Sequence, residues 1–442
     1  MDELAAREFA LKILKRVEQG AYADKMLESL LPKSRLSDTD KALVRELVLG
    51  VTKWRRRLDW ILKVYLVKGP HRLNPWIKNI LRLGIYQILF LDRIPPWAAV
   101  DEAVKLAEKY GHEGTKRLVN GVLRRVAREG DNVEYPNVKT DPAIYLSVYY
   151  SHPLWTVRRW IERYGVAETV KLCEFNNANP KVFIRTNSLK TTPERLIGQL
   201  EAEGIKARPN QLLVEFLELE SAEGLFKTRC FLEGHFQVQD PGAGMASMLL
   251  DPRPGERVLD MCSAPGGKAT HMAEMMRNEG LILALDKQKR RLRTLQENIR
   301  RLGVQIIQTK AEDALNFTSE PFDRVLVDVP CSGSGTFCRR ADARWKMRER
   351  IEELTGLQLA LLKKGAELLK PGGVLVYSTC SIEPEENDMV VERFLKENPG
   401  FTLEKAEKVL PSIADQYVKI FPPRDGCDGS FAARIRRRGE YD

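Results

Sequence analysis

The spacing of apolar residues divides this chain of 442 residues into parts with different local structure. Across residues 1–130 apolar positions recur every three to four residues, which is the period of a helix with one buried face. The clearest predicted helices span residues 38–54, 77–91, 98–110 and 115–128. Ser37 precedes the first of them, a position typical of a helix N-cap. We therefore expect an all-α bundle of about six or seven helices in this part.

The apolar period is lost and then shortens in the middle of the chain. Residues 131–153 are rich in Asn, Asp, Pro and Tyr, so we expect a loop-like linker there. The residues beyond it mix strand-like and helix-like runs, with strands expected at 182–186, 213–217 and 236–238 and a helix near 192–203. This part is predicted to be a small α+β insert.

From about residue 255 apolar runs of strand length alternate with amphipathic helices. Strands are predicted at residues 258–261, 281–285, 304–309, 324–327 and 374–377, helices at 268–277 and 350–369 and up to 301, and a turn at 371–373. Such alternation predicts a C-terminal α/β Rossmann-like fold, doubly wound, with a mostly parallel sheet and helices on both faces. Ligands of such sheets bind beyond the carboxyl ends of the strands.

Charge is unevenly distributed between these parts. The whole chain has 71 Lys and Arg residues against 61 Asp and Glu, a net charge of +10. Residues 1–130 contain 26 basic and 16 acidic residues, so this third carries the whole excess. A basic domain joined to a neutral one indicates a phosphate-rich partner, although a solvated helical surface would show the same excess. The densest basic points, 55–57 and 124–125, could clamp RNA phosphates or simply face water.

Composition argues against several classes of protein. No apolar stretch reads as a membrane span and the N-terminal residues lack the apolar core of a signal peptide, so a cytoplasmic location is expected. Seven widely spaced cysteines do not form a disulfide framework. No Cys-x-x-Cys pair occurs and the five histidines are scattered, so no metal site is expected.

A glycine-containing turn follows the first predicted strand of the C-terminal part, in the sequence VLDMCSAPGGK. Gly266 and Gly267 let the backbone approach a ligand closely, and the helix that begins there offers free N–H groups. The spacing fits neither a P-loop nor a dinucleotide fingerprint. Asp286 ends the next strand, where an acid can accept both ribose hydroxyls, and Asp313 follows the third strand and could accept from an adenine amine. A nucleoside cofactor with little phosphate is indicated, and S-adenosyl-L-methionine fits.

Two cysteines, Cys331 and Cys380, lie just after the ends of two later strands, in the contexts DVPC and STCS. A thiolate that adds to C6 of a pyrimidine makes C5 enamine-like, so that C5 can take a methyl group from a sulfonium. A base then removes the C5 proton and the thiol leaves. Asp328 beside the ring could stabilise the charge that develops on N3 and the exocyclic nitrogen. Buried structural cysteines are the alternative, but polar, glycine-containing strand exits favour the catalytic interpretation.

Three stretches of the C-terminal part resemble the motifs of a known family. The stretches are DMCSAPGGK, DVPCSGSGT and YSTCSIEPEEN. Their order and spacing are similar to those of the motifs in RNA (cytosine-5) methyltransferases of the Nol1/Nop2/Sun type. Residues 1–130 resemble the RNA-binding helical domain of the NusB antitermination factor. The pairing is similar to the bacterial Sun/RsmB type of ribosomal RNA methyltransferase, and the resemblance covers nearly the whole chain.

The resemblance implies roles for individual residues. Cys380 would be the attacking nucleophile, and Cys331 would assist product release. Lys268 would orient Asp328 or the base, whereas Cys262 opens the cofactor loop and is not expected to be a nucleophile. The implied cofactor contacts are Cys262, Ser263, Ala264, Pro265, Gly266, Gly267, Lys268, Asp286, Asp313 and Asp328.

The resemblance also implies a substrate and a domain organisation. We expect a monomeric enzyme that methylates C5 of one cytosine in small-subunit (16S) ribosomal RNA, free or in an assembling subunit, with S-adenosyl-L-methionine as cofactor. Transfer RNA as substrate, or a non-catalytic RNA-binding regulator or ribosome assembly factor, are the alternatives; intact motifs favour the enzyme and the NusB-like part favours ribosomal RNA. The expected domains are a NusB-like RNA-binding domain (1–135), a linker (136–153), an RNA-binding insert (154–240) and the methyltransferase domain (241–442).

Overall fold

The computed structural model describes residues 4–66 and 69–439, which fall into two compact units. One unit contains Met1–Ala178 and the short segment Phe337–Trp345, and the other contains Asn179–Thr336 and Lys346–Asp442. Arg344 and Trp345 anchor that segment among helices of the first unit. The Arg344 guanidinium donates to the carbonyl of Asn176 at 2.9 Å, and the Trp345 indole donates to the carbonyl of Thr52 at 2.9 Å.

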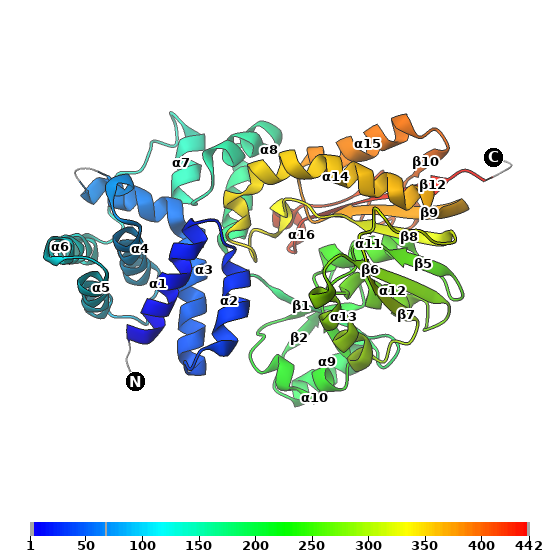
Figure 1. Ribbon diagram of the computed structural model, residues 1–442, viewed down its shortest axis with the longest axis horizontal. Helices are drawn as coiled ribbons and strands as arrows, with labels where there is room; N and C mark the ends of the chain where they lie inside the picture. The colour runs from blue at the N-terminus through cyan, green and yellow to red at the C-terminus, as the bar shows by residue number, and fades with distance from the viewer. Residues whose placement is uncertain (1–3, 67–68, 440–442) are drawn as a thin grey trace. The chain divides into compact units, whose positions relative to one another are not determined.

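The first unit is helical, and the predicted helices of residues 1–130 are confirmed (Figure 1). Ser37 caps α3 by accepting the N–H of Asp40 at 3.1 Å. This helix continues past the predicted end at Trp54 because Leu58 and Leu62 extend its buried face. The helices of this part are α1 (Leu4–Glu18), α2 (Ala23–Leu30), α3 (Asp38–Tyr65), α4 (Pro75–Phe90), α5 (Pro96–Tyr110) and α6 (Glu113–Glu129).

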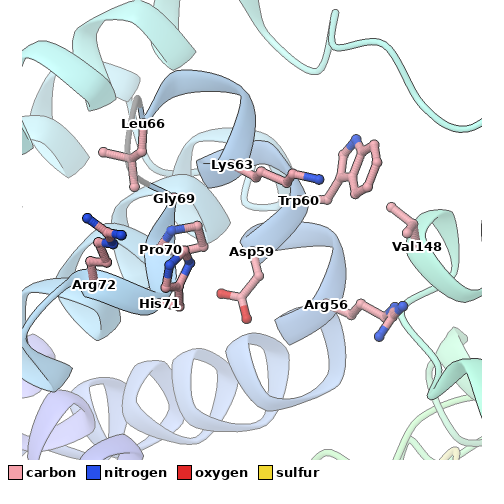
Figure 2. A pocket seen from close by; sticks show the side chains of 10 residues that line it. All are labelled: Arg56, Asp59, Trp60, Lys63, Leu66, Gly69, Pro70, His71, Arg72 and Val148. Atoms are coloured by element: carbon pink, nitrogen blue, oxygen red, sulfur yellow. The ribbon is translucent and has the colours of Figure 1, made fainter.

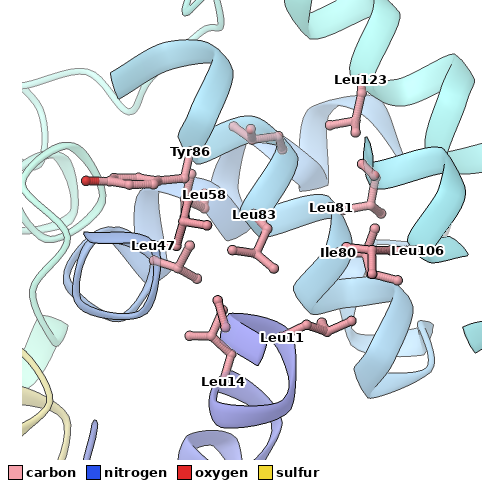
Figure 3. Packing of buried hydrophobic residues seen from close by; sticks show 14 of the residues in the cluster. Leu11, Leu14, Leu47, Leu58, Ile80, Leu81, Leu83, Tyr86, Leu106 and Leu123 are labelled. Carbon is pink, nitrogen blue, oxygen red and sulfur yellow. The ribbon is translucent and has the colours of Figure 1, made fainter. Parts of the chain in front are cut away.

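Leucine and isoleucine side chains from these helices form one continuous core (Figure 3). Leu11 of α1, Leu47 of α3, Leu81 of α4 and Leu106 of α5 are almost completely buried in it. The apolar period of the sequence therefore marked the buried faces correctly.

The expectation of a loop across 131–153 is wrong for its second half. Residues Pro142–Tyr149 form α7, and a longer helix, α8 (Leu154–Asn177), follows. Asp141 accepts the N–H of Ile144 at 2.9 Å and caps α7, and Pro142 occupies the first turn, where it is tolerated. The residues that suggested a loop are thus a helix start.

The insert of the second unit is an antiparallel sheet of four strands in the order β2-β3-β1-β4. The predicted strands at 182–186 and 236–238 are confirmed as β1 (Val182–Thr186) and β4 (Phe236–Val238). The strand expected at 213–217 is displaced to β3 (Phe216–Leu219), because the Asn210 side chain accepts the N–H groups of Leu212 and Leu213 and holds them in a turn. The remaining elements are α9 (Pro193–Ala202), β2 (Ala207–Pro209) and α10 (Arg229–Leu232).

The large sheet of the second unit confirms the doubly wound, mostly parallel fold, with strand order β10-β12-β9-β8-β5-β6-β7. Strands β5 to β9 run parallel, whereas β12 is antiparallel to its neighbours β9 and β10. Its strands are β5 (Arg257–Asp260), β6 (Leu281–Asp286), β7 (Ile307–Ala311), β8 (Phe322–Asp328), β9 (Leu369–Thr379), β10 (Phe401–Glu404), β11 (Val418–Ile420) and β12 (Ser430–Arg437). Residues 371–373 do not form the predicted turn: β9 runs through them, with Gly372 at φ +73° where the pairing with β8 is irregular.

Helices cover both faces of this sheet. One core joins the sheet to α11 (Pro241–Leu250), α12 (Gly267–Met275) and α13 (Lys289–Leu302), and the other joins it to α14 (Met347–Glu367) and α15 (Asp388–Glu397). A short helix, α16 (Pro422–Asp425), precedes β12. None of the described helices is long and apolar enough to span a bilayer.

The strand order creates a switch point between β5 and β8. The chain passes from β5 outward through β6 and β7, then returns to place β8 on the other side of β5. The carboxyl ends of these strands, which carry Asp260, Asp286 and Asp328, therefore share one edge of the sheet. Ligands of such folds bind at this edge.

Candidate active site

The loop between β5 and α12 makes a tight turn at the switch point. Gly266 has φ +100°, and a Cβ there would lie 2.2 Å from Cδ1 of Leu295, so only glycine fits. The Gly266 N–H donates to the carbonyl of Ser263 at 2.7 Å, and Arg291 donates to the carbonyl of Ala264. These bonds hold the loop compact ahead of the first turn of α12.

A buried arginine from the insert supports the same turn. Arg185 of β1 is fully buried and donates to the carbonyl of Gly267 at 2.8 Å. Its guanidinium also pairs with both carboxylate oxygens of Glu274 in α12, at 3.0 and 2.6 Å. The insert sheet and the start of α12 are thus joined by charge-assisted bonds.

Two of the predicted acids follow neighbouring strands. Asp286, at the end of β6, accepts the N–H of Gln288 at 2.8 Å and pairs with Arg291 at 3.1 Å. Asp313, after β7, accepts from Lys287 at 2.9 Å, and this bond lowers the pKa of its carboxyl. Both carboxylates have oxygens able to accept from a further ligand.

Asp260 and Ser263 are buried next to each other where β5 ends. Burial raises the pKa of Asp260 to about 7, although the Ser263 hydroxyl and the backbone N–H of Cys262 favour its charged form. Each carboxylate oxygen can accept more than one hydrogen bond, so Asp260 can also accept from a ligand that carries N–H or O–H donors.

Cys331 and Cys380 are brought together at the ends of β8 and β9. Their Sγ atoms lie 3.2 Å apart. The hydrogen bond to Cys380 and burial hold the pKa of the Cys331 thiol well above its ordinary value. Cys331 therefore stays a protonated thiol that can donate to the Cys380 sulfur.

Asp328 and Lys268 lie at the same edge as the two cysteines. The Lys268 ammonium donates to Oδ2 of Asp328 at 2.6 Å, and the Ser378 hydroxyl donates to Oδ1 at 2.6 Å. Burial alone would lower the pKa of Lys268. The attraction of Asp328 and its hydrogen bond act against burial, and the pKa of Lys268 is raised. The carboxylate of Asp328 is thereby held in one orientation.

Cys262 is almost buried in the cofactor loop. Burial and the neighbouring carboxylates of Asp328, Asp260 and Asp286 raise the pKa of its thiol. A thiol kept protonated in this way is a poor nucleophile. Across the described residues no cluster of three or more His, Cys, Asp or Glu side chains could hold a metal ion.

Sequence reasoning missed Glu386, which ties the two cysteine loops together. Its carboxylate is fully buried and accepts from the backbone N–H of Ser332 at 2.7 Å, the Ser332 hydroxyl at 2.5 Å and the amide of Gln358 at 3.1 Å. Glu383 and Glu385 lie beside it in the sequence, so no pattern singles it out. Only the fold shows which of these acids points toward the neighbouring strand exit.

The C-terminal stretch that precedes β12 packs on the same loops. Gly335 donates to the carbonyl of Cys380 at 3.0 Å, and Gly429 donates to the carbonyl of Gly335 at 2.9 Å. A Cβ on Gly335 would lie 2.3 Å from the Gly429 carbonyl oxygen. Three segments distant in sequence thus meet around Cys380.

Three family models match the chain. The 16S rRNA methyltransferase RsmB/F model matches residues 247–436, the NusB family model matches 4–128, and the ferredoxin-like domain of RsmF/B-like methyltransferases matches 152–224. The probable ribosomal RNA small subunit methyltransferase B of Bacillus subtilis is 38% identical, over 99% of this chain and all of that protein. The chain belongs to the ribosomal RNA small subunit methyltransferase B family.

Further relatives support the same family assignment. The ribosomal RNA small subunit methyltransferase B of Salmonella dublin is 33% identical over 96% of this chain and 97% of its own length. The crystal structure of PH0851 superimposes with a TM-score of 0.80 and 27% identity, covering 99% of both chains. A methyltransferase homolog from Pyrococcus horikoshii, with TM-score 0.59 and 30% identity, covers 67% of this chain and 99% of its own.

Proposed function

We propose that this methyltransferase transfers a methyl group from S-adenosyl-L-methionine to C5 of a cytosine in 16S ribosomal RNA, through a covalent bond between Cys380 and C6 of the base. The observation that carries the proposal is the pair of thiols 3.2 Å apart beside an oriented carboxylate at the switch point of the sheet. The RNA would be met in the cytoplasm, and the target base would leave its stack to reach Cys380.

The cofactor would lie along the loop that follows β5. Asp286 would accept from the ribose hydroxyls and Asp313 from the adenine amine, because Asp286 ends β6, the neighbour of β5, and Asp313 follows β7, the next strand outward. Asp260, buried beside Ser263 at the end of β5, would accept from the amino group at the amino-acid end, since its carboxylate oxygens can take further donors. The bound cofactor would supply a sulfonium methyl group and leave as the thioether S-adenosylhomocysteine.

Attack by the Cys380 thiolate on C6 would form a carbon–sulfur bond and move electron density to C5, which then takes the methyl group. Asp328 would accept from the exocyclic amine and orient the ring, while the Lys268 ammonium beside it would offset the negative charge that develops on the ring. The C5 proton then leaves to a base, the ring double bond re-forms, and the bond to Cys380 breaks by elimination.

Cys331 is the base that the geometry favours. The largest influence that keeps its thiol protonated is the hydrogen bond to Cys380. That influence disappears once the Cys380 sulfur is bonded to carbon, so Cys331 would then lose its proton to water more readily, and the resulting thiolate could take the C5 proton. The same pair of thiols can thus serve attack and release in turn.

The direct test compares Cys380→Ala with Cys331→Ala. We expect C380A to abolish both methylation and any covalent RNA adduct, measured with labelled methyl donor and by denaturing gel. C331A should retain adduct formation and accumulate it, because release is blocked. Loss of the adduct in C331A with retention in C380A would instead reverse the two roles.

A matched control is Cys230→Ala, which removes a buried thiol from α10 of the insert. It should methylate RNA at close to the wild-type rate. Methylation by C380A at that same rate would contradict the proposal, and RNA binding without any methyl transfer by the wild type would favour a non-catalytic RNA-binding protein. Mapping of the labelled base would separate ribosomal from transfer RNA.

A further inference from the structure

A basic groove in the helical unit has no role in the chemistry described above. The groove has a volume of about 810 Å³ and is formed by the end of α3, residues 69–72 and α7 (Figure 2). Arg56, Trp60 and Lys63 line it from α3, and His71 and Arg72 line it from the connection to α4. It is made entirely by residues of one unit.

The positive charge of this groove is not balanced by its own residues. Asp59 is the acid in its wall, and both of its oxygens accept from the Arg82 guanidinium at 2.7 Å. Lys63 and Arg72, both exposed, form no ion pair with the residues that the structure describes. The groove therefore presents cations without an available counter-charge.

Arg56 is the most constrained of these cations. Its Nε is buried and has no hydrogen-bond acceptor within the described ranges 4–66 and 69–439. Its backbone N–H is held by the Ser151 hydroxyl at 3.0 Å, which fixes where its side chain leaves α3. A buried guanidinium donor left unpaired is costly unless a ligand accepts from it.

Trp60 provides a fixed aromatic surface beside these cations. Its indole N–H donates to the carbonyl of Glu134 at 3.1 Å, and the Lys63 ammonium lies 5.0 Å from the ring centroid. An anchored ring with cations around it is the combination that holds single-stranded nucleic acid, since bases stack and phosphates pair.

We propose that this groove binds a single-stranded segment of the substrate RNA, with phosphates on Arg56, Lys63 and Arg72 and one base against Trp60. The inference rests on the proposed function, because the segment would belong to the ribosomal RNA that is methylated. It assigns the helical unit a defined contact with that RNA, separate from the contacts of the target base.

The test uses the full chain and a labelled single-stranded ribosomal RNA fragment of about twelve nucleotides, with binding followed by fluorescence anisotropy at several salt concentrations. Each lost phosphate contact should lower the slope of log K against log salt by about 0.7. The triple variant R56Q/K63Q/R72Q should therefore bind more weakly, with a slope smaller by about 2.

The matched control is K33Q/R35Q/R124Q, which removes two arginines and one lysine from exposed positions outside the groove. Its slope should stay close to that of the wild type. Equal losses in both triple variants would overturn the proposal, because the interaction would then follow net charge alone.

Trp60 offers a second, independent measurement. Trp60→Ala should weaken binding about five- to hundredfold, whereas Trp60→Phe, which keeps a ring, should bind within a few-fold of the wild type. Unchanged binding by W60A would overturn the stacking contact. Failure of the proposed function would give a different result: the wild-type protein would leave the RNA unmethylated, while all of these differences in binding persisted.

Discussion

Individual buried carboxyl groups govern how this site is organised. Asp328, Asp260 and Glu386 lie at neighbouring strand exits, yet their surroundings differ: Asp328 pairs with an ammonium, Glu386 accepts from three neutral donors, and Asp260 is fully buried beside Ser263. Composition alone cannot tell these three acids apart.

Asp260 predicts a specific dependence of stability on pH. Its pKa is about 7 in the folded chain against 3.8 ordinarily, because burial disfavours the charged form. Between these values the folded state binds more protons than the unfolded state, so Asp260 lowers stability as pH rises. Asp260→Asn removes this effect, and its stability relative to the wild type should grow by up to about 1.4 kcal/mol per pH unit until about pH 7.

Urea unfolding without ligand at several pH values from 4 to 8 measures this difference. Asp313→Asn is the control, because the pKa of Asp313 is lowered by Lys287 and its contribution changes only at more acidic pH. If the free energies of unfolding of D260N and the wild type differed by the same amount at every pH, a buried, neutral Asp260 would be contradicted.

Glu386 is expected to act as a positioning residue for the cysteines. Glu386→Gln replaces one acceptor oxygen by an amide that faces the donors of Ser332 and Gln358. Misplacement of the thiols should lower kcat about 10- to 100-fold with little change in KM for the methyl donor. Steady-state kinetics check this split, and Glu397→Gln, on the exposed surface of α15, should match the wild type.

The elements of the second unit place the site through close backbone contacts. The β8 exit, the β9 exit and the start of β12 meet at Gly335, Cys380 and Gly429. Glycine is needed where two backbones are in contact. The strand order alone would therefore not bring these loops into contact without Gly335 and Gly429.

Gly335→Ala should separate these loops. Its Cβ would meet the Gly429 carbonyl oxygen at 2.3 Å, so one backbone must move, at a cost of about 1–3 kcal/mol. Denaturant unfolding should show the loss, together with reduced adduct formation. Gly356→Ala is the matched control: it lies exposed in α14 with open space around it and should stabilise the chain by about 0.5–1 kcal/mol. Equal stability of the two variants would contradict the packing.

The whole molecule separates a basic helical unit from a unit built on a twisted sheet. The segment Phe337–Trp345 is the exception, because its chain leaves the loop after Cys331 and its side chains pack within the helical unit. The basic groove and the paired cysteines thus belong to different units.

This separation predicts a selective response to S-adenosylhomocysteine in calorimetry. A ligand of the sheet edge stabilises the fold it binds by about 2.7 kcal/mol at a hundred times its Kd. We expect the unfolding transition of the second unit to rise in temperature in the wild type, and little rise in Asp286→Ala. Asp323→Asn, at the opposite end of β8, should keep the full shift. An equal rise in the unfolding temperature of D286A would show that Asp286 does not contact the cofactor.

The sequence by itself determined the helical period of the first part, the strand–helix alternation of the last and the motifs at its strand ends. These are local properties: Ser37 caps its helix and Val182–Thr186 is extended because neighbouring residues favour those conformations. Tertiary structure alone decided that the carboxylate of Glu386 joins the cysteine loops and that Arg56 has a buried unpaired donor. The reason is physical: burial and partnership depend on segments far apart in the chain, and no local pattern records them.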